Sequence, residues 1–152
     1  MIALRPFEPT DDAALISWLR SAAELTLFTG PKLTWPLTSE QLDGIRATPE
    51  FAAFTAIVDD EVIGHIELIS TGDDSARIGR VLLDPAQRGR GLGEALVRAA
   101  IAEASARGIR SLSLFVYPDN TPAVRLYEKL GFTSHGESEL LPGSTLMELS
   151  LG

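Results

Sequence analysis

Hydrophobic residues along the chain recur at two different spacings, and the spacing predicts where strands and helices form. Residues Phe51–Val58 and Val62–Ser70 are rich in β-branched and aromatic side chains, and the acidic turn Asp59-Asp60-Glu61 separates them. This pattern is typical of a β-hairpin. Further strands are predicted at Ile2–Phe7, Ala76–Leu83, Leu112–Val116, Phe132–Ser138 and Thr145–Leu151.

Helices are predicted where apolar residues recur every three or four positions. The first follows the cluster Thr10-Asp11-Asp12 and includes Trp18, which this spacing places in the core rather than in a ligand site. The second opens at Thr38, which stands three residues before Gln41 as in a capping box. Two more helices are predicted from Leu92 to Arg107-Gly108 and from Thr121-Pro122 to Gly131, and Gly30–Leu37 is predicted to be a loop.

The predicted elements follow one another as β-α-α-β-β-β-α-β-α-β-β. Helices alternate with strands in the middle of this order, whereas hairpins stand on either side of it. The order therefore predicts an α/β (α+β) fold in which one sheet combines antiparallel hairpins with a parallel crossover. At 152 residues the chain is expected to form a single domain, residues 1–152.

Composition narrows the classes of function. Thirteen basic against 21 acidic residues give a net charge of −8, which disfavours a general nucleic-acid surface. The chain has no cysteine, so it has no disulfide, thiolate metal site or cysteine nucleophile, and no metal is expected. It has no apolar run of the roughly 18–20 residues that span a membrane and no recognisable signal peptide, so a cytoplasmic protein without a membrane partner is expected.

The segment Arg88-Gly89-Arg90-Gly91-Leu92-Gly93 joins the end of a predicted strand to the start of a helix. Its glycines let a ligand approach the backbone, its N–H groups lie at the positive end of the helix, and its two arginines add charge. The segment predicts a phosphate site, with a flexible glycine-rich turn as the alternative. A dinucleotide fingerprint is excluded because Glu94 stands where it needs glycine, and a Walker-type loop is excluded because no lysine lies nearby.

Two motifs follow one another along the chain. The first is Leu83-Asp84-Pro85 followed by Gln87–Gly93, and the second consists of Asn120, Ala123, Leu126-Tyr127 and Leu130-Gly131-Phe132. In this order they resemble the GNAT superfamily of N-acetyltransferases, whose acyl-CoA pyrophosphate motif is similar to the first. The predicted element order matches the family over nearly the whole chain. The resemblance implies a mixed, mostly antiparallel sheet whose central parallel pair of strands splays apart, with helices on both faces.

The resemblance also implies how acetyl-CoA, the co-substrate, is held. Its pantetheine arm would lie between the splayed strands and bond to the backbone of Val81 and Leu83, and the segment Arg88–Gly93 would hold its pyrophosphate. Asn120 would anchor the co-substrate beside the last helix, with the alternative that it only caps that helix.

In this family a neutral amine attacks the thioester directly, a tetrahedral intermediate forms and the CoA thiolate leaves. Tyr127 is the expected acid that protonates the sulfur, because a phenol with a pKa of about 10 is protonated at rest; its spacing alone favours a packing role. Phe115 occupies the position where many relatives carry a glutamate base. Glu67 is the expected substitute, with His65 on the same side of its strand or a water chain as alternatives.

The family's acceptor site corresponds here to residues 27–37 and 134–144. Phe28 and Trp35 are expected to form an apolar wall, although Trp35 is equally suited to cover the edge of the domain. Glu137 and Glu139 are expected to meet a cationic group of the acceptor, a small-molecule or peptide amine, and the protein is expected to be a monomer or homodimer. A non-catalytic acyl-CoA-binding, regulatory module is the alternative. A nucleotide-binding or phosphotransfer domain is the weakest interpretation, because it lacks a Lys-Ser/Thr pair.

Overall fold

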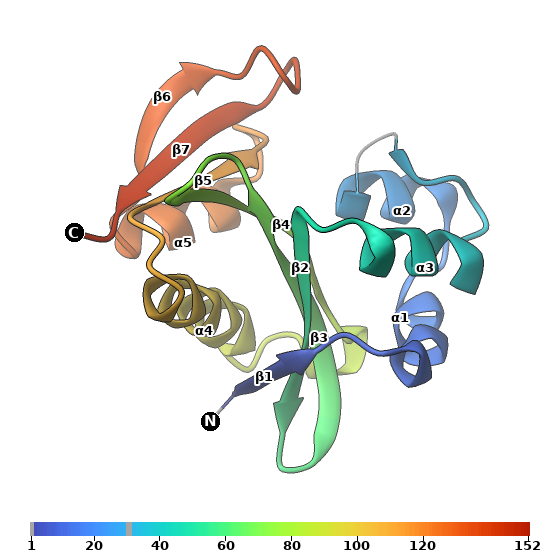
Figure 1. Ribbon diagram of the computed structural model, residues 1–152. Coiled ribbons are helices and arrows are strands. Elements are labelled where there is room, and N and C mark those ends of the chain that lie inside the picture. Colours follow the sequence, from blue (N-terminus) through green and yellow to red (C-terminus); the bar gives the residue numbers. More distant parts are fainter. Residues whose placement is uncertain (1, 30–31) are drawn as a thin grey trace.

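One mixed β-sheet forms the centre of the protein in the computed structural model, which describes residues 2–29 and 32–152 (Figure 1). Its strands are β1 (Ala3–Pro6), β2 (Phe51–Val58), β3 (Glu61–Ser70), β4 (Ser75–Leu83), β5 (Ser111–Val116), β6 (Thr133–Glu137) and β7 (Thr145–Ser150). They lie in the spatial order β1-β2-β3-β4-β5-β7-β6. Each neighbouring pair is antiparallel except β4 and β5, which are parallel.

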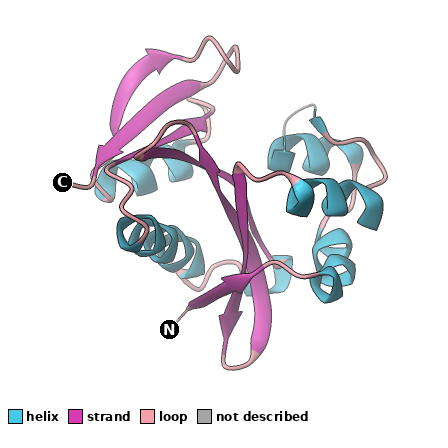
Figure 2. Cartoon of the chain, viewed as in Figure 1, coloured by secondary structure: helices cyan, strands magenta, loops and turns pink. Residues whose placement is uncertain are grey.

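Helices cover both faces of the sheet. On one side lie α1 (Asp12–Trp18), α2 (Ala22–Thr29) and α3 (Ser39–Ala47), and on the other lie α4 (Leu92–Ala106) and α5 (Thr121–Lys129) (Figure 1 and Figure 2). Short 3₁₀ turns at Pro9–Asp11 and Pro85–Gln87 precede α1 and α4. This arrangement confirms the architecture that the resemblance implied. Of the helices described, none is both long enough and apolar enough to cross a membrane.

The structure corrects the predicted order of elements at one place. Three α-helices, not two, stand between β1 and β2, because Ala22–Thr29 forms α2. Only Leu25 and Phe28 of this helix are buried, while Leu27 is 74% exposed, so its apolar residues do not form one helical stripe. Packing of the two buried side chains against the core therefore stabilises α2, and the local sequence pattern does not reveal it.

The segment before α3 agrees with its prediction only in part. Of the predicted loop, Gly30 and Pro31 lie outside the described residues, and residues 32–37 contain neither α-helix nor strand. Thr38 caps α3 as predicted, since its side chain accepts a hydrogen bond from the backbone N–H of Gln41 at 3.4 Å. The Gln41 amide does not complete the capping box but bonds to the backbone of the preceding loop, which it holds against α3.

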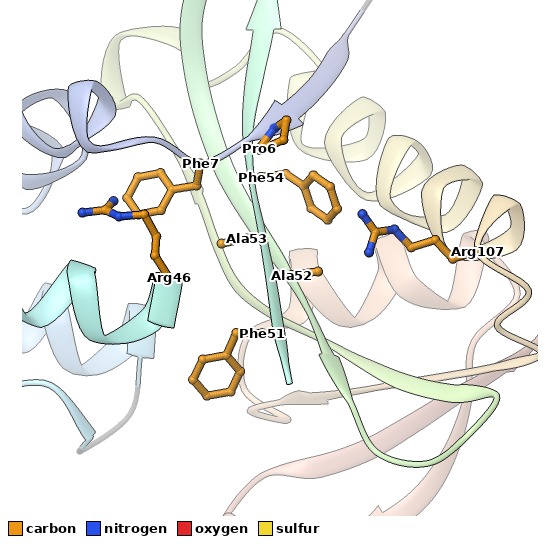
Figure 3. Close-up of a pocket in the computed structure, with 8 residues that line it drawn as sticks. All are labelled: Pro6, Phe7, Arg46, Phe51, Ala52, Ala53, Phe54 and Arg107. Atoms are coloured by element: carbon orange, nitrogen blue, oxygen red, sulfur yellow. The ribbon is translucent and has the colours of Figure 1, made fainter. Parts of the chain in front are cut away.

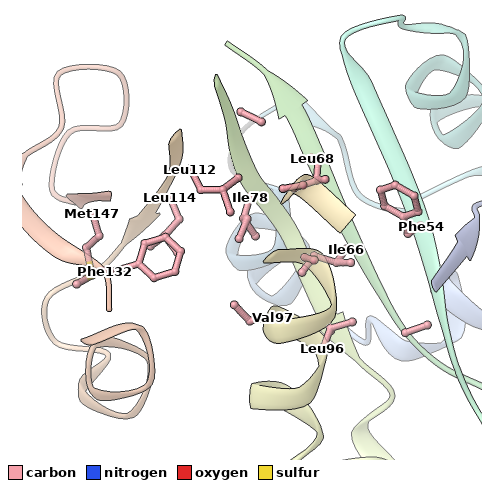
Figure 4. Packing of buried hydrophobic residues seen from close by; sticks show 14 of the residues in the cluster. Phe54, Ile66, Leu68, Ile78, Leu96, Val97, Leu112, Leu114, Phe132 and Met147 are labelled. Atoms are coloured by element: carbon pink, nitrogen blue, oxygen red, sulfur yellow. The ribbon is translucent and has the colours of Figure 1, made fainter. Parts of the chain in front are cut away.

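Two hydrophobic clusters fill the space on either side of the sheet. The larger one packs α4 and α5 onto the sheet and brings together Ile66, Ile78, Leu96 and Leu112 (Figure 4). The second packs α1, α2 and α3 onto the opposite face. Trp18 belongs to this second cluster and is 7% exposed, which confirms its prediction as a core residue.

A bulge interrupts the pairing of β4 with β3. Glu67 pairs with Gly79 and His65 pairs with Leu82, so two residues of β4 stand opposite one residue of β3. One of the two, Arg80, has a φ of 46°, which few residues other than glycine adopt. The extra residue reverses the direction of the side chains that follow it, so that Leu82 packs against α1–α3.

β4 and β5 pair only near their N-terminal ends. Ser75–Arg77 pairs with Ser111–Ser113, and no pairing follows. The facing edges of the two strands are therefore unpaired beyond this point, over Gly79–Leu83 of β4 and Leu114–Val116 of β5. We call these two facing edges the fork. The fork confirms the splayed parallel pair that the resemblance implied.

Candidate active site

The glycine-rich segment lies between the end of β4 and the start of α4. Gly89 and Gly91 have φ values of 80° and 73°, which favour glycine over other residues. A Cβ atom at either position would meet nothing within 4 Å, so the space beside the backbone is open. In the described chain the N–H groups of Gly89, Arg90 and Gly91 donate to no backbone carbonyl. Together with the free N–H groups of the first turn of α4, they form a donor set that fits a phosphate group.

Arg88 and Arg90 add positive charge to this segment. Both residues are exposed, and neither forms an ion pair within the part of the chain described. Glu94, in the first turn of α4, accepts hydrogen bonds from Lys129 at 2.7 Å and from Arg98 at 3.0 Å, and these partners lower the pKa of Glu94. The acidic side chain beside the segment is therefore neutralised, whereas the two arginines are available to an anion.

The fork leads from this segment into the sheet. Val81 and Leu83 lie on β4 beyond its last pairing with β5. Both pack against the cluster beneath α4 and α5, which also includes Tyr127. An extended chain that carries amide groups can pair with a free strand edge as another strand would. The described residues therefore fit acetyl-CoA, with its amide-containing arm along the fork and its phosphates at the glycine-rich segment.

Asn120 begins α5 as its N-cap. Its Oδ1 accepts a hydrogen bond from the backbone N–H of Ala123 at 3.4 Å, which is the capping alternative that the sequence left open. The cap uses only the oxygen of the side-chain amide. The NH₂ group donates to no other residue in the described chain, so the expected contact with the co-substrate remains a prediction.

Tyr127 lies in the second turn of α5 and is half-buried. Its ring contacts Phe132 edge to face, with 5.8 Å between the ring centroids. Burial raises the pKa of Tyr127, so the hydroxyl is protonated at neutral pH. This hydroxyl forms no hydrogen bond within the described residues and is available as a donor.

Glu67 is fully buried at the centre of a polar network on the side of α1–α3. Its carboxylate accepts hydrogen bonds from Arg80 at 2.6 Å and from His65 Nε2 at 2.7 Å. Arg80 Nε also donates to the hydroxyl of Thr29 at 2.8 Å, so the network joins the bulge of β4 to the end of α2. Because a carboxylate only accepts, His65 donates to Glu67 through Nε2, and in a neutral imidazole with this tautomer the lone pair is on Nδ1. His65 Nδ1 is the one buried side-chain polar atom without a partner among the described residues.

The predicted acceptor residues lie in different settings. Phe28 is 7% exposed and belongs to the core beneath α2, where its ring centroid lies 5.8 Å from that of His65. Trp35 is 43% exposed. Glu137 at the end of β6 and Glu139 in the loop that follows are both exposed. The structure therefore brings Phe28 to the Glu67 network, and it places Trp35 and the two glutamates at the surface.

A hollow of about 300 Å³ at the edge of β1 and β2 is not favoured as the site (Figure 3). Its apolar lining includes Phe7 and Phe54, and its two charged residues are already engaged. Arg46 pairs with Asp12 and stacks on Phe7, and Arg107 pairs with Glu103 and stacks on Phe54. In residues 2–29 and 32–152 no group of three or more acidic or histidine side chains is arranged to hold a metal ion.

Two residues that complete the Glu67 network, Arg80 and Thr29, were not predicted from the sequence. Their contact depends on the bulge and joins positions 51 residues apart in the chain. The one local signal is Gly79, because a glycine inside a strand pattern often marks a bulge.

Comparison with known proteins identifies the family. Residues 13–132 match the model of the Acetyltransferase (GNAT) family. The chain belongs to this family. A mycothiol acetyltransferase of Streptomyces griseus subsp. griseus is 33% identical over 139 residues, which are 88% of this chain and 44% of that protein. A streptothricin acetyltransferase of Escherichia coli is 32% identical over 101 residues, which are 66% of this chain and 58% of that protein.

This GNAT chain thus spans about half the length of the curated relatives it matches. Among solved structures, AAC(6')-Ib in complex with ribostamycin and coenzyme A has a TM-score of 0.82 and 25% identity, and the match covers 99% of this chain and 93% of that one. The PaiA N-acetyltransferase of Thermoplasma acidophilum in complex with coenzyme A has a TM-score of 0.75 at 20% identity, covering 99% of both chains. These structures share the GNAT fold with this chain.

Proposed function

We propose that this GNAT chain is a single N-acetyltransferase domain, residues 1–152, that moves the acetyl group of acetyl-CoA to a small-molecule or peptide amine. The observation that carries the proposal is the fork, whose β4 edge runs directly into the open glycine-rich segment. Relatives named as acetyltransferases of mycothiol and streptothricin support an enzyme with a small-molecule acceptor. They do not favour a non-catalytic acyl-CoA-binding module.

The chain's own residues would hold acetyl-CoA at three points. The backbone of Val81 and Leu83 would pair with the pantetheine arm, and Asn120 would contact the co-substrate through its free NH₂ group. The pyrophosphate would lie against the glycine-rich segment, which consists of Arg88, Gly89, Arg90, Gly91, Leu92 and Gly93. Bound acetyl-CoA supplies the thioester that the amine attacks directly.

Tyr127 is the proposed acid. Its hydroxyl is protonated because burial raises its pKa, and it has no competing hydrogen bond in the described chain. Tyr127 packs against the same cluster as Val81 and Leu83, which supports a position beside the fork. The phenol would donate its proton to the departing sulfur.

Glu67 and His65 are the proposed base, acting as a pair. Both oxygens of Glu67 are occupied by donors, so the proton would be accepted at the lone pair of His65 Nδ1 rather than at the carboxylate itself. Glu67 would fix the orientation of the imidazole through Nε2, as a carboxylate does for a catalytic histidine in other enzymes. The imidazole lies between the rings of Phe7 and Phe28, so proton transfer would require a small opening between α2 and β3.

The acceptor would enter from the side of α2 and the β6–β7 hairpin. Trp35 would supply an exposed apolar contact, and Phe28 would form the buried base of the wall. Glu137 and Glu139 would meet a cationic part of the acceptor from the hairpin, where both are exposed.

Release of CoA thiol from acetyl-CoA in the presence of a panel of amines tests the proposal. Turnover with at least one amine, and calorimetric binding of CoA, are the expected results. Binding of CoA without thiol release for any amine would instead indicate the non-catalytic module. Failure to bind CoA would contradict both functions.

A further inference from the structure

Arg77 stands at the closed end of the fork. It is the last residue of β4 that pairs with β5, where its partner is Ser113. Its guanidinium carbon lies 5.0 Å from the centre of the Phe115 ring, so the side chain crosses from one strand of the fork to the other. Its neighbours Ala76 and Ile78 face α4, so Arg77 lies on the opposite face of the sheet, on the side of α1–α3.

Arg77 has no counter-charge among the residues that the structure describes. The side chain is half-buried, and within residues 2–29 and 32–152 it forms no hydrogen bond and no ion pair. The nearby Glu67 is occupied by Arg80, and Glu148, which lies across Ser113 on β7, forms no ion pair in the described chain. Burial and the positive charge of Arg80 both disfavour the charged form of Arg77, and they lower the pKa of Arg77. A half-buried guanidinium without a counter-charge is unfavourable, and a bound anion would relieve that cost.

An anion at Arg77 cannot be the pyrophosphate held by the glycine-rich segment. Six residues of extended strand separate Arg77 from Leu83, which amounts to about 20 Å at roughly 3.3 Å per residue. The glycine-rich segment lies farther still along the chain. An anion bound at Arg77 would therefore come from the other substrate, the amine acceptor.

We propose that Arg77, supported by Phe115 and Ser113, binds a carboxylate that the acceptor carries close to its reacting amine. This inference rests on the proposed function and adds the chemical class of the acceptor, an amino carboxylate. The planar guanidinium matches a carboxylate with two parallel hydrogen bonds, and the Ser113 hydroxyl adds a donor on the neighbouring strand. The single positive charge of Arg77 balances a carboxylate monoanion. A phosphate dianion would leave one negative charge unbalanced at the site, in a protein whose net charge is already −8. The same acceptor can carry a cationic group toward Glu137 and Glu139.

The test compares two amines that differ only in this group, phenylalanine and phenylalaninamide, at saturating acetyl-CoA. For each enzyme the ratio of kcat/KM for the carboxylate to kcat/KM for the amide is measured, so the different basicities of the two amines cancel between enzymes. Arg77→Gln should lower this ratio about ten- to a hundredfold, as expected for loss of a hydrogen bond to a charged group. Arg77→Lys, which keeps the charge but loses the planar pair of donors, should lower it less and covers the case in which the glutamine variant fails to fold.

Arg107→Gln is the matched control, because it removes one positive charge at the far end of α4 and should leave the ratio unchanged. A binding measurement makes the inference independent of turnover: N-acetylglycine, in the presence of CoA, should shift the Arg77 Nε–H resonance saturably, and N-acetylglycinamide should not. Turnover with an unchanged ratio in Arg77→Gln, or equal shifts with both probes, would overturn the carboxylate subsite and leave the acetyltransferase proposal standing. A specific shift without turnover on any amine would contradict the acetyltransferase proposal and retain the subsite.

Discussion

Tyr127 occupies a position in which its packing and its chemistry can be separated experimentally. The ring lies against Phe132 and the core cluster, whereas the hydroxyl has no partner in the described chain. Removing only the oxygen therefore changes the proton donor and leaves the packing in place.

Tyr127→Phe should lower kcat about 10- to 1000-fold because the departing thiolate loses its acid, while the affinity for CoA is retained. Steady-state kinetics with a reactive amine and calorimetry with CoA measure the two quantities. Tyr117→Phe, at a tyrosine that is 38% exposed in the loop after β5, is the control and should leave kcat unchanged. Wild-type turnover in Tyr127→Phe, under conditions where chemistry limits the rate, would make Tyr127 a packing residue.

In the Glu67 network, structural stabilisation and proton transfer can also be tested separately, with different variants. Glu67→Gln leaves the buried Arg80 without its counter-charge, and loss of one partner of a buried pair costs about 3–5 kcal/mol of unfolding free energy. His65→Gln keeps the Arg80–Glu67 pair, so it should destabilise the fold less. It should nevertheless lower kcat, because the proposed proton acceptor at Nδ1 is lost.

Urea unfolding and steady-state kinetics of both variants provide the measurements. A His65→Gln enzyme with the wild-type kcat, under conditions where chemistry limits the rate, would exclude His65 as the base and leave Glu67 itself or a water chain. In that case His65 would serve only to complete the buried network.

The glycine-rich segment and α4 act together as one element, and Gly93 is the position at which this can be tested without straining the backbone. Gly91 has a positive φ, so any substitution there would be strained. Gly93 lies inside α4, and a Cβ atom at this position would lie 3.8 Å from the side chain of Leu83, which is an ordinary contact.

Gly93→Val should weaken CoA binding at least tenfold, about 1.4 kcal/mol, because the added side chain obstructs approach of the pyrophosphate to the N–H groups of α4. Gly44→Val is the control: Gly44 is an exposed helical glycine of α3 where a Cβ atom would meet nothing within 4 Å, so CoA affinity should not change. Calorimetry with CoA on both folded variants measures the two affinities. Unchanged affinity in Gly93→Val would mean that the phosphate site lies elsewhere.

The extent to which the sequence predicts each element depends on how local its determinants are. The hairpin of β2 and β3, the cap of α3 at Thr38 and the glycine-rich segment follow from neighbouring residues, and all are present as predicted. α2 is not predicted from the sequence because its stability comes from burial of Leu25 and Phe28 by distant parts of the chain. The partners of Glu67 are not predicted because they depend on the bulge, which shifts the register between two strands.

At the scale of the whole molecule, stability depends on pH through Asp11, which joins β1, β2 and the start of α1. Its carboxylate accepts hydrogen bonds from Arg5 at 2.7 and 2.8 Å, from the Glu8 N–H at 2.9 Å and from the Thr55 hydroxyl at 2.7 Å. Burial by itself would raise the pKa of Asp11, but these donors outweigh it and lower the pKa from 3.8 to about 2.

Because the folded state holds Asp11 ionised, its contribution to stability is complete above its unfolded pKa and is lost as the pH falls from about 4 to about 2. The shift corresponds to about 2 kcal/mol. Asp11→Asn should therefore lower the unfolding free energy by about this amount at pH 7 and flatten its fall below about pH 4, as measured by urea unfolding. Asp73→Asn, in an exposed turn, should keep the wild-type slope. If the unfolding free energies of Asp11→Asn and of the parent protein fell equally steeply below about pH 4, this account would be contradicted.

Within the described chain, the fork leaves two sheet edges without strand partners, at the seam where β1–β4 meets β5–β7–β6. Three residue pairs hold this seam, so a ligand that pairs with the free edges adds bonds across it that only the folded chain can offer. Such a ligand shifts the folding equilibrium by RT ln(1 + [L]/Kd), about 2.7 kcal/mol when its free concentration is one hundred times Kd. The melting temperature then rises with saturation of the fork, so a thermal shift reports its occupancy and the supply of ligand sets the folding stability of the chain.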